Sequence, residues 1–305
     1  MRLAFGKTLV ELGFKYKDLY VVDADSASHT MTSIFAKNFP ERFVNVGISE
    51  QDLVGIAAGL ASCNKKVVVA TYASFLMRAW EQIRNVVGRA RLNVKLVGTH
   101  GGISNYGDGP SHQCFEDFAL MRVIPGMKVI APADSVELRC CFEEVLSVDG
   151  PTYMRIGRDE DERVYDDCVC RLGVANVVRD GVDVAIVAVG GMVFEALKAS
   201  KELRNYGIDA AVLDFHTIKP LDTNTLVKYA RSTGALVVAE EHNILGGLGS
   251  TVAEALIREY PVPIEFVGVK DMYGHSARSL EDLRKFLGLT ASDIVRAVGR
   301  VVKVK

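Results

Sequence analysis

The stretch Asn45-Val46-Gly47-Ile48-Ser49-Glu50-Gln51-Asp52 runs directly into the apolar segment Leu53-Val54-Gly55-Ile56-Ala57-Ala58-Gly59-Leu60-Ala61. The second part predicts a helix that is apolar on nearly every face and therefore buried, with Glu50 at its start. Burial of a lone carboxylate costs free energy without a hydrogen-bond partner, and it favours the protonated form. Alternatively, Glu50, Gln51 and Asp52 form a solvated first turn whose acids interact with the helix dipole. The downstream sequence decides between these two interpretations.

Predicted strands and helices alternate on both sides of this stretch, with a polar loop at Ala24–Thr32. In the first half we expect strands at Leu19–Asp23, Val44–Val46, Lys66–Thr71, Val94–Val97, Lys128–Ala131 and Tyr153–Ile156, and helices at Leu3–Leu12, Glu50–Cys63, Leu76–Arg89, Phe115–Arg122 and Ser135–Leu146. In the second half we expect strands at Val182–Val189, Ala210–Leu213, Ala235–Ala239 and Ile264–Val267, and helices at Met192–Tyr206, Leu221–Arg231 and Ser250–Glu259. Strands separated by helices of this length predict an α/β fold with parallel sheets.

A charged run at Arg158–Arg163, followed by Tyr165–Cys170, separates the two alternating series and is the best linker candidate. We therefore expect two domains, at residues 1–165 and 166–305. Each should contain a mostly parallel sheet with helices on both faces. The chain length of 305 residues accommodates two ordinary domains.

Composition excludes several classes of protein. The chain is 49% hydrophobic and 24% charged, with a formal net charge of −2, so neither a nucleic acid nor an anionic membrane is expected as partner. The longest apolar runs are strand-sized, and the beginning of the chain has no hydrophobic signal core. We expect a cytoplasmic protein.

Six cysteines occur, and their spacing does not match a zinc knuckle or a thioredoxin-like pair. A chain of this size does not need disulfide bonds to stabilise a small core. We therefore expect reduced thiols at Cys63, Cys114, Cys140, Cys141, Cys168 and Cys170.

Candidate ligand-binding residues follow the predicted strands. Tyr72 and Phe75 fall at the carboxyl end of a strand, where ligands of parallel sheets bind, and their rings can stack on a flat heterocycle or simply pack in the core. The long glycine-rich loop from His100 to His112 adds two histidines and Asp108. Long polar loops of this kind are usually functional.

Taken in order, these motifs resemble the C-terminal half of transketolase, deoxyxylulose-phosphate synthase and the β subunits of 2-oxo acid dehydrogenases. The resemblance runs nearly from Arg2 to the end of the chain. It implies that Glu50 hydrogen-bonds N1′ of the aminopyrimidine of thiamine diphosphate, and that Tyr72 and Phe75 stack on that ring.

The same resemblance implies substrate contacts. Asp108 and His112 match a loop acid and histidine that contact the substrate hydroxyls and the reacting carbon, and His100 matches a substrate-binding histidine. Arg158 matches an arginine that binds the sugar phosphate. Arg2 and Ser28 match two further phosphate contacts. Glu50 and His112 are thus the expected catalytic residues.

Two departures from the family pattern affect the prediction. Arg78 replaces an aromatic cofactor contact of ordinary transketolases, as in deoxyxylulose-phosphate synthase, and we expect it to contact the cofactor too. The Mg²⁺ motif of the family is a Gly-Asp-Gly followed some thirty residues later by Asn. Here Gly107-Asp108-Gly109 stands before a proline, and the next Asn is Asn176. We therefore expect no metal ligand in this chain.

A glycine cluster at Gly246–Gly249 also follows a predicted strand and precedes a helix, as in a dinucleotide-binding site. It lacks the G-x-G-x-x-G spacing, and close packing of helix on strand explains it better.

The leading hypothesis is the C-terminal subunit of a split transketolase that transfers a two-carbon ketol unit between sugar phosphates. A separate N-terminal subunit would share thiamine diphosphate with this chain and hold its Mg²⁺, in an α2β2 assembly. One alternative is a deoxyxylulose-phosphate-synthase-like protein or the β subunit of a 2-oxo acid dehydrogenase. Another is a non-catalytic dimeric relative.

Overall fold

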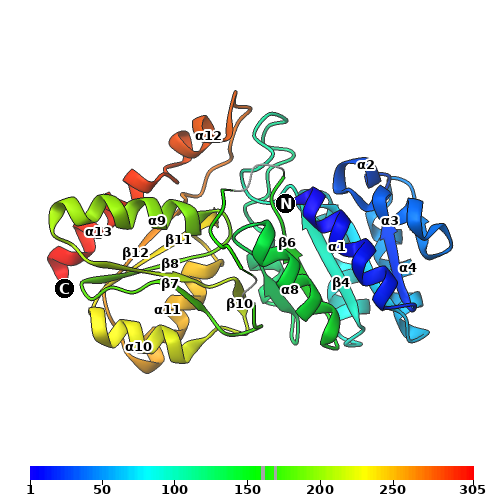
Figure 1. Ribbon diagram of the computed structural model, residues 1–305, viewed down its shortest axis with the longest axis horizontal. Helices are drawn as coiled ribbons and strands as arrows, with labels where there is room; N and C mark the ends of the chain where they lie inside the picture. Colours follow the sequence, from blue (N-terminus) through cyan, green and yellow to red (C-terminus); the bar gives the residue numbers. More distant parts are fainter. Residues whose placement is uncertain (159–161, 168–169) are drawn as a thin grey trace.

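The computed structural model describes residues 1–158, 162–167 and 170–305. Figure 1 shows two lobes side by side, the N-terminal half from blue to green and the C-terminal half from green to red. Each lobe is built on its own sheet, with helices on both faces, so the predicted α/β architecture is confirmed. The boundary between residues 165 and 166 stays a prediction.

The first sheet, in the described residues, has seven strands in the order β10-β5-β6-β4-β3-β1-β2. Those of the first half are all parallel, at β1 (Leu19–Asp23), β2 (Phe43–Asn45), β3 (Lys66–Tyr72), β4 (Val94–Thr99), β5 (Lys128–Ile130) and β6 (Thr152–Arg155). The seventh, β10 (Thr217–Lys219), comes from the second half of the chain and pairs with β5 in the antiparallel sense. This short strand was not predicted.

Alternating side chains of the central strand β3 face opposite layers of helices. Val68 and Ala70 lie in a core with α1 (Arg2–Lys15), α3 (Thr32–Asn38) and α8 (Ser135–Ser147). Val67 and Val69 lie in a second core, which includes α4 (Glu50–Ser62) and α7 (Asp117–Arg122). This second core continues into the C-terminal half through residues such as Val187 and Leu213. The two lobes therefore share apolar packing.

Two predicted segments are built differently in the structure. The expected loop at Ala24–Thr32 contains the short helix α2 (Ala27–Thr30) and the start of α3. The helix expected over Leu76–Arg89 is broken into α5 (Ala73–Leu76), a 3₁₀ turn, α6 (Trp80–Gln82) and a π-helical turn, Ile83–Gly88. Helical periodicity alone does not separate these closely related helix types.

Helix α4 is buried on one side only, so the prediction of burial on nearly every face is wrong for the single chain. Leu53, Val54 and Ala57 are fully buried, whereas a Cβ at Gly55 or Gly59 would have no atom of another described segment within 4 Å. Ile48, just before the helix, is 82% exposed. An apolar sequence cannot distinguish burial within a chain from burial against a second one.

The second sheet, again in the described residues, has the order β12-β11-β8-β9-β7. Its strands are β7 (Asn176–Arg179), β8 (Val184–Ala188), β9 (Ala210–Asp214), β11 (Leu236–Asn243) and β12 (Ile264–Val269). Only β7 is antiparallel to its neighbour. The surrounding helices are α9 (Met192–Leu203), α10 (Thr223–Thr233), α11 (Leu248–Glu259), α12 (Leu280–Leu287) and α13 (Ala291–Val301). Strand β7 and the helices α12 and α13 were not predicted.

The glycine cluster before α11 has a structural role. The Glu240 carboxylate accepts hydrogen bonds from the backbone N–H groups of Leu248 and Gly249 at 2.7 and 2.8 Å. A Cβ at Gly249 would lie 2.6 Å from the ring of Phe266. Close packing therefore explains these glycines, and a carboxylate of the protein already occupies the start of the helix.

The cysteines contradict the expectation of reduced thiols. Cys141 on α8 and Cys170 form a disulfide, and Cys140 is also disulfide-bonded. Cys63, which is exposed, and Cys114, which is buried, are free, and Cys168 lies outside the described residues. The spacing of the cysteines did not predict the Cys141–Cys170 pair, because the two residues are 29 positions apart and only the fold brings the segment of Cys170 next to α8. Among the helices that the structure describes, none has the length and apolarity needed to cross a bilayer.

Candidate active site

Several of the predicted site residues lie where three parallel strands end. Tyr72 is the last residue of β3, His100 follows β4, and the segment after β1 carries α2. Arg2, at the start of α1, donates from Nη1 to the backbone carbonyl of His29 on α2 over 2.6 Å. Because neighbouring strands β1, β3 and β4 are parallel, their carboxyl ends meet at one edge.

Tyr72 is the centre of an aromatic cluster. Its ring stacks on His100 with centroids 3.7 Å apart and on Phe75 with centroids 4.9 Å apart. The ring of His112 stands edge-on to Tyr72 and Phe75, at 6.1 and 5.2 Å. Such pairs stabilise the arrangement of the rings beyond the area they bury. The structure thus brings together four residues that the sequence predicted separately.

His100 is buried, and both of its ring nitrogens have partners. Nη1 of Arg2 lies 3.1 Å from Nε2, and Oγ1 of Thr99 lies 2.8 Å from Nδ1. A guanidinium only donates, so Nε2 accepts and the hydrogen is on Nδ1. Thr99 in turn donates to the carbonyl of Thr71 at 3.2 Å. His100 also has a φ of 55°, in the left-handed region that side chains rarely adopt. This series of hydrogen bonds holds the ring of His100 against that of Tyr72.

The charges of Arg2, Asp108 and Arg158 affect the pKa of the Tyr72 hydroxyl group. Burial is the main cause that raises the pKa of Tyr72, and the negative charge of Asp108 acts in the same direction. Arg2 and Arg158 oppose this shift through their positive charges. Asp108 is exposed and Arg158 is half-buried. Two cations and one anion are therefore close enough to Tyr72 to affect its hydroxyl group.

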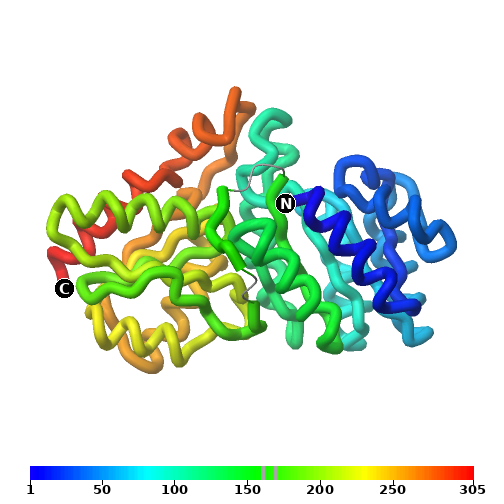
Figure 2. Tube along the Cα trace, in the orientation of Figure 1, coloured from blue at the N-terminus to red at the C-terminus, as the bar shows by residue number. Residues whose placement is uncertain are grey.

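The loop that carries His112 is held in place by the second half of the chain. Nε2 of Gln113 donates to the carbonyl of His275 at 3.0 Å, and the backbone N–H of Ala277 donates to the carbonyl of Tyr106 at 2.9 Å. Figure 2 shows the corresponding orange segment next to the teal loop at the junction of the lobes. On the loop itself, Nδ1 of His112 lies 2.9 Å from the hydroxyl of Ser111.

Glu50 begins α4, as predicted, and its side chain is 7% exposed. Among the described residues it pairs with Nε of Arg78, which lies 3.6 Å from Oε2, beyond hydrogen-bonding distance. Arg78 is 76% exposed and follows Phe75 by three residues, so the carboxylate and the aromatic cluster share one side of the domain. The buried carboxylate retains the capacity to hydrogen-bond a ligand.

Sequence reasoning missed Asp23, which fixes the segment after β1. Its fully buried carboxylate accepts hydrogen bonds from the backbone and hydroxyl of Ser26 and from the hydroxyls of Thr30 and Thr32, at 2.7–3.1 Å. Burial raises the pKa of Asp23, and these hydrogen bonds oppose the shift. The spacing of one acid before three hydroxyl residues was the available signal. Ser28 lies on α2 within this segment and is exposed.

Arg158 follows β6 and is joined to the start of the chain. Its backbone carbonyl accepts a hydrogen bond from the N–H of Arg2 at 3.2 Å. On β6 itself, Arg155 is buried and pairs with Asp117 at 3.0 Å. The same guanidinium donates to the carbonyls of Cys114 and Glu241, so it ties the loop to the second lobe.

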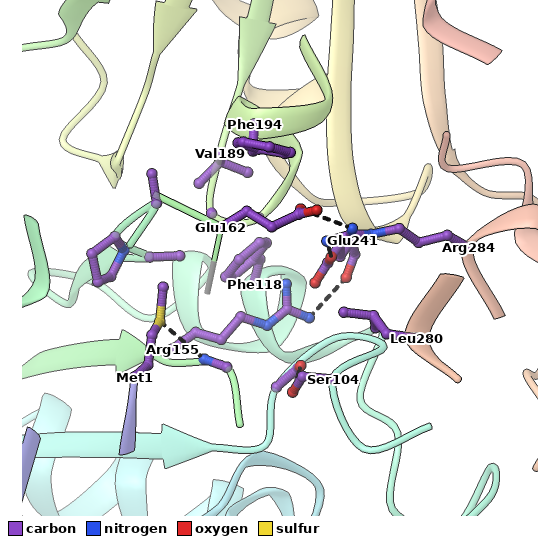
Figure 3. Close-up of a pocket in the computed structure, with 17 residues that line it drawn as sticks. Met1, Ser104, Phe118, Arg155, Glu162, Val189, Phe194, Glu241, Leu280 and Arg284 are labelled. Carbon is purple, nitrogen blue, oxygen red and sulfur yellow. Dashed lines mark hydrogen bonds and ion pairs between the residues drawn. The ribbon is translucent and has the colours of Figure 1, made fainter. Parts of the chain in front are cut away.

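A separate pocket lies between the lobes (Figure 3). Arg155 enters it from β6, and Arg284 enters it from α12, where it pairs with Glu162 at 3.1 Å and with Glu241 at 3.6 Å. Acidic groups thus accompany both arginines, and the described lining residues include none of the predicted substrate contacts.

Two family models match the sequence. The pyrimidine binding domain of transketolase matches residues 1–161, and the transketolase C-terminal domain matches residues 173–294. The chain belongs to the transketolase family. This family depends on thiamine diphosphate.

Two relatives of this transketolase-family chain are of nearly the same length. A putative transketolase C-terminal section of Methanocaldococcus jannaschii is 40% identical and covers 99% of this chain and 96% of its own length. The 6-deoxy-6-sulfo-D-fructose transketolase subunit of Clostridium sp. is 39% identical, over 100% of this chain and 95% of its own. A split gene transketolase, solved as an inactive β4 tetramer, is 46% identical with a TM-score of 0.91, covering 100% of this chain and 98% of that one.

The residues present fit an aminopyrimidine. Glu50 offers a buried carboxylate whose pairing with Arg78, among the described residues, is longer than a hydrogen bond, and Phe75, three residues before Arg78, offers an aromatic ring. A carboxyl group can hydrogen-bond a ring nitrogen, and an aromatic ring can stack on a flat heterocycle. Apart from Cys141, Cys170 and His216, the described residues contain no cluster of histidine, cysteine and carboxylate groups close enough to hold an ion.

Proposed function

We propose that this chain is the C-terminal subunit of a thiamine-diphosphate-dependent transketolase that transfers a two-carbon ketol unit between sugar phosphates. A separate N-terminal subunit would bind the diphosphate and Mg²⁺. The observation that carries the proposal is the aromatic cluster of Tyr72, Phe75, His100 and His112, bordered by the cations of Arg2 and Arg158.

Each residue has a role that its position supports. Glu50 would hold or release a proton at N1′ of the pyrimidine, Phe75 and Tyr72 would stack on that ring, and Arg78 would lie at its edge. When bound, the cofactor supplies the electron sink for cleavage of the ketose carbon–carbon bond.

On the substrate side, His112 would move a proton at the reacting oxygen, since it lies on the loop at the mouth of the cluster. Asp108 would accept hydrogen bonds from substrate hydroxyls. Arg158 would bind the terminal phosphate with its planar donors, with Arg2 and Ser28 beside it. His100 would contact substrate once the anion draws Arg2 away from Nε2.

The open face of α4 supports a partner chain. Ile48 is 82% exposed, and Gly55 and Gly59 leave room for close approach of another backbone. An exposed apolar surface beside a binding site is a feature of protein interfaces. We infer an α2β2 assembly, in which the N-terminal subunit completes the cofactor site.

A second candidate rests on Arg78, which stands beside Glu50 where ordinary transketolases have an aromatic residue. This residue favours a deoxyxylulose-phosphate-synthase-like reaction, in which pyruvate is the donor. Donor choice distinguishes the two reactions, because only ketol transfer uses a ketose phosphate.

The experiment is reconstitution. The chain alone and the chain purified with its N-terminal partner are each supplied with thiamine diphosphate and Mg²⁺ and assayed with ketose phosphate, hydroxypyruvate and pyruvate donors. We expect ketol transfer by the complex only. Transfer by the single chain would refute the split site, and pyruvate as sole donor would favour the second candidate. A complex that binds cofactor without turnover would identify a non-catalytic relative.

A further inference from the structure

Outside the candidate active site, the sulfur atoms of buried Cys141 and half-buried Cys170 lie close to a ring nitrogen of buried His216. Sγ of Cys141, Sγ of Cys170 and a ring nitrogen of His216 all lie within 4.8 Å of one another. Cys141 is on α8, and His216 stands between β9 and β10, whose backbone pairs with β5. The labels α8 and β10 in Figure 1 mark this junction at the centre of the molecule. Three separate segments of the chain therefore contribute to one small cluster.

One ring nitrogen of His216 has a hydrogen-bond partner among the described residues and the other has none. Its ring is fully buried, and Nδ1 lies 2.9 Å from the hydroxyl of Thr217. Nε2 has no hydrogen-bond partner among the described residues. The backbone of Val174 favours the protonated form of the His216 ring, but it is not in hydrogen-bonding geometry with Nε2. Buried polar atoms normally have a partner, so this nitrogen requires an explanation.

We propose that Cys141, Cys170 and His216 form a metal site in the reduced protein. The ion is a divalent one that prefers thiolate ligands, such as Zn²⁺. Oxidation of the two thiolates to the Cys141–Cys170 disulfide abolishes the site. Two thiolates and an imidazole are a preferred donor set for zinc. Zinc–sulfur and zinc–nitrogen bonds of about 2.3 and 2.1 Å place tetrahedral donors roughly 3.5–3.8 Å apart. The present separations require only small movements to reach this geometry.

The disulfide form converts to the metal-bound form by reduction followed by metal binding. A dithiol reductant breaks the Sγ–Sγ bond, supplies two electrons and two protons, and is itself oxidised to a disulfide. Metal binding then displaces the two thiol protons to solvent, and Nε2 of His216 donates its lone pair. Thr217 supports the ligand by fixing the ring through Nδ1, as residues behind metal-bound histidines usually do. The fourth coordination position is left for water or another thiolate.

The experiment is a Co²⁺ titration of the metal-free, anaerobically reduced chain, compared with the oxidised chain. We expect one equivalent to bind to the reduced form only, with visible d–d bands of tetrahedral Co²⁺ and near-ultraviolet thiolate-to-cobalt charge transfer. Cys141→Ser and His216→Asn should weaken binding by more than the roughly 10–100-fold that loss of a supporting residue costs. Cys63→Ser, at the exposed free cysteine, is the matched control and should bind normally.

Thr217→Val is a second test in case the His216→Asn variant does not fold. It removes the hydrogen bond to Nδ1 of His216 and keeps the volume of the threonine side chain. It should weaken Co²⁺ binding by about 10-fold with unchanged far-ultraviolet circular dichroism. Absence of the cobalt bands in the reduced wild type would overturn the proposal and leave the pair as a disulfide only. Bands that persist at full strength in both His216→Asn and Thr217→Val would overturn it as well.

Discussion

Arg2 donates from Nη1 to Nε2 of His100 over 3.1 Å, and this contact joins the first helix to the residue that stacks on Tyr72. The guanidinium thereby selects the neutral tautomer of His100 with hydrogen on Nδ1. The same Nη1 donates to the backbone carbonyl of His29, so the hydrogen bonding of His100 depends on the position of this guanidinium.

Glu50→Gln should leave the fold intact and lower kcat of the reconstituted complex by at least ~10²-fold, because an amide cannot transfer a proton to N1′. The matched control is Glu41→Gln, the same substitution at a glutamate that is 68% exposed and lies outside α4, and it should have little effect. Steady-state kinetics of both variants test the assignment. If the Glu50→Gln complex works within a few-fold of the parent, Glu50 is a helix-start acid only.

Arg158→Ala should raise KM for sugar phosphates roughly 10- to 100-fold and leave KM for hydroxypyruvate nearly unchanged. Charge-assisted hydrogen bonds to phosphate contribute about 1.5–3 kcal/mol, and only the phosphorylated donor makes them. Arg163→Ala is the control, since Arg163 is exposed and pairs with Asp166. The alternative pairing of Arg158 with Asp159, Glu160 or Asp161 involves residues outside the described ones. That pairing predicts small and equal changes for both donors.

Stability should fall as pH rises from about 4 to 7 because of Asp214. Burial raises the pKa of this carboxyl from 3.8 to about 7, and burial also raises that of Glu137 beside it. In this window the unfolded chain loses the proton while the folded chain keeps it, so ionisation favours unfolding by on the order of 2–4 kcal/mol.

Asp214→Asn should flatten this pH dependence, because its amide oxygen still accepts the hydrogen bond that Tyr165 donates at 2.7 Å and cannot ionise. Denaturant midpoints measured across the window check the expectation. Asp166→Asn, at a 95% exposed carboxylate, should leave the slope as it is in the parent. A parent whose midpoint does not decline with pH would show that Asp214 ionises normally.

Removal of the Cys141–Cys170 disulfide by a double substitution to serine should lower the free energy of unfolding by about 2–4 kcal/mol under oxidising, metal-free conditions. The bond joins residues 29 positions apart and restricts the unfolded chain. Thermal or denaturant unfolding measures the change, with Cys63→Ser as the neutral control. Equal midpoints for parent and double variant would contradict a stabilising role.

Local patterns predicted the elements well. Strand β1 occupies Leu19–Asp23 as expected, and α4 begins at Glu50 because an acid precedes a long apolar run. Tyr72 was correctly placed at the carboxyl end of a parallel strand, and the structure brings its ring together with those of His100 and His112. Regular crossover connections make such neighbours readable from chain order.

Contacts between distant segments were not accessible in this way. The hydroxyls around Asp23, the pairing of Cys141 with Cys170 and the interaction of Gln113 with His275 depend on how the chain returns on itself. The open face of α4 was misjudged because a sequence records that a surface is apolar and not which chain covers it. Role assignments such as that of Arg158 came from the family resemblance.

Strand β10 has a consequence for any attempt to divide the chain. It covers the edge of the first sheet at β5, although it belongs to the sequence of the second half. A fragment ending near residue 165 would expose the backbone N–H and C=O groups of β5 to pairing with other molecules, which is a common start of aggregation. A cut between the two family-model regions would therefore remove the strand that closes this edge of the first sheet.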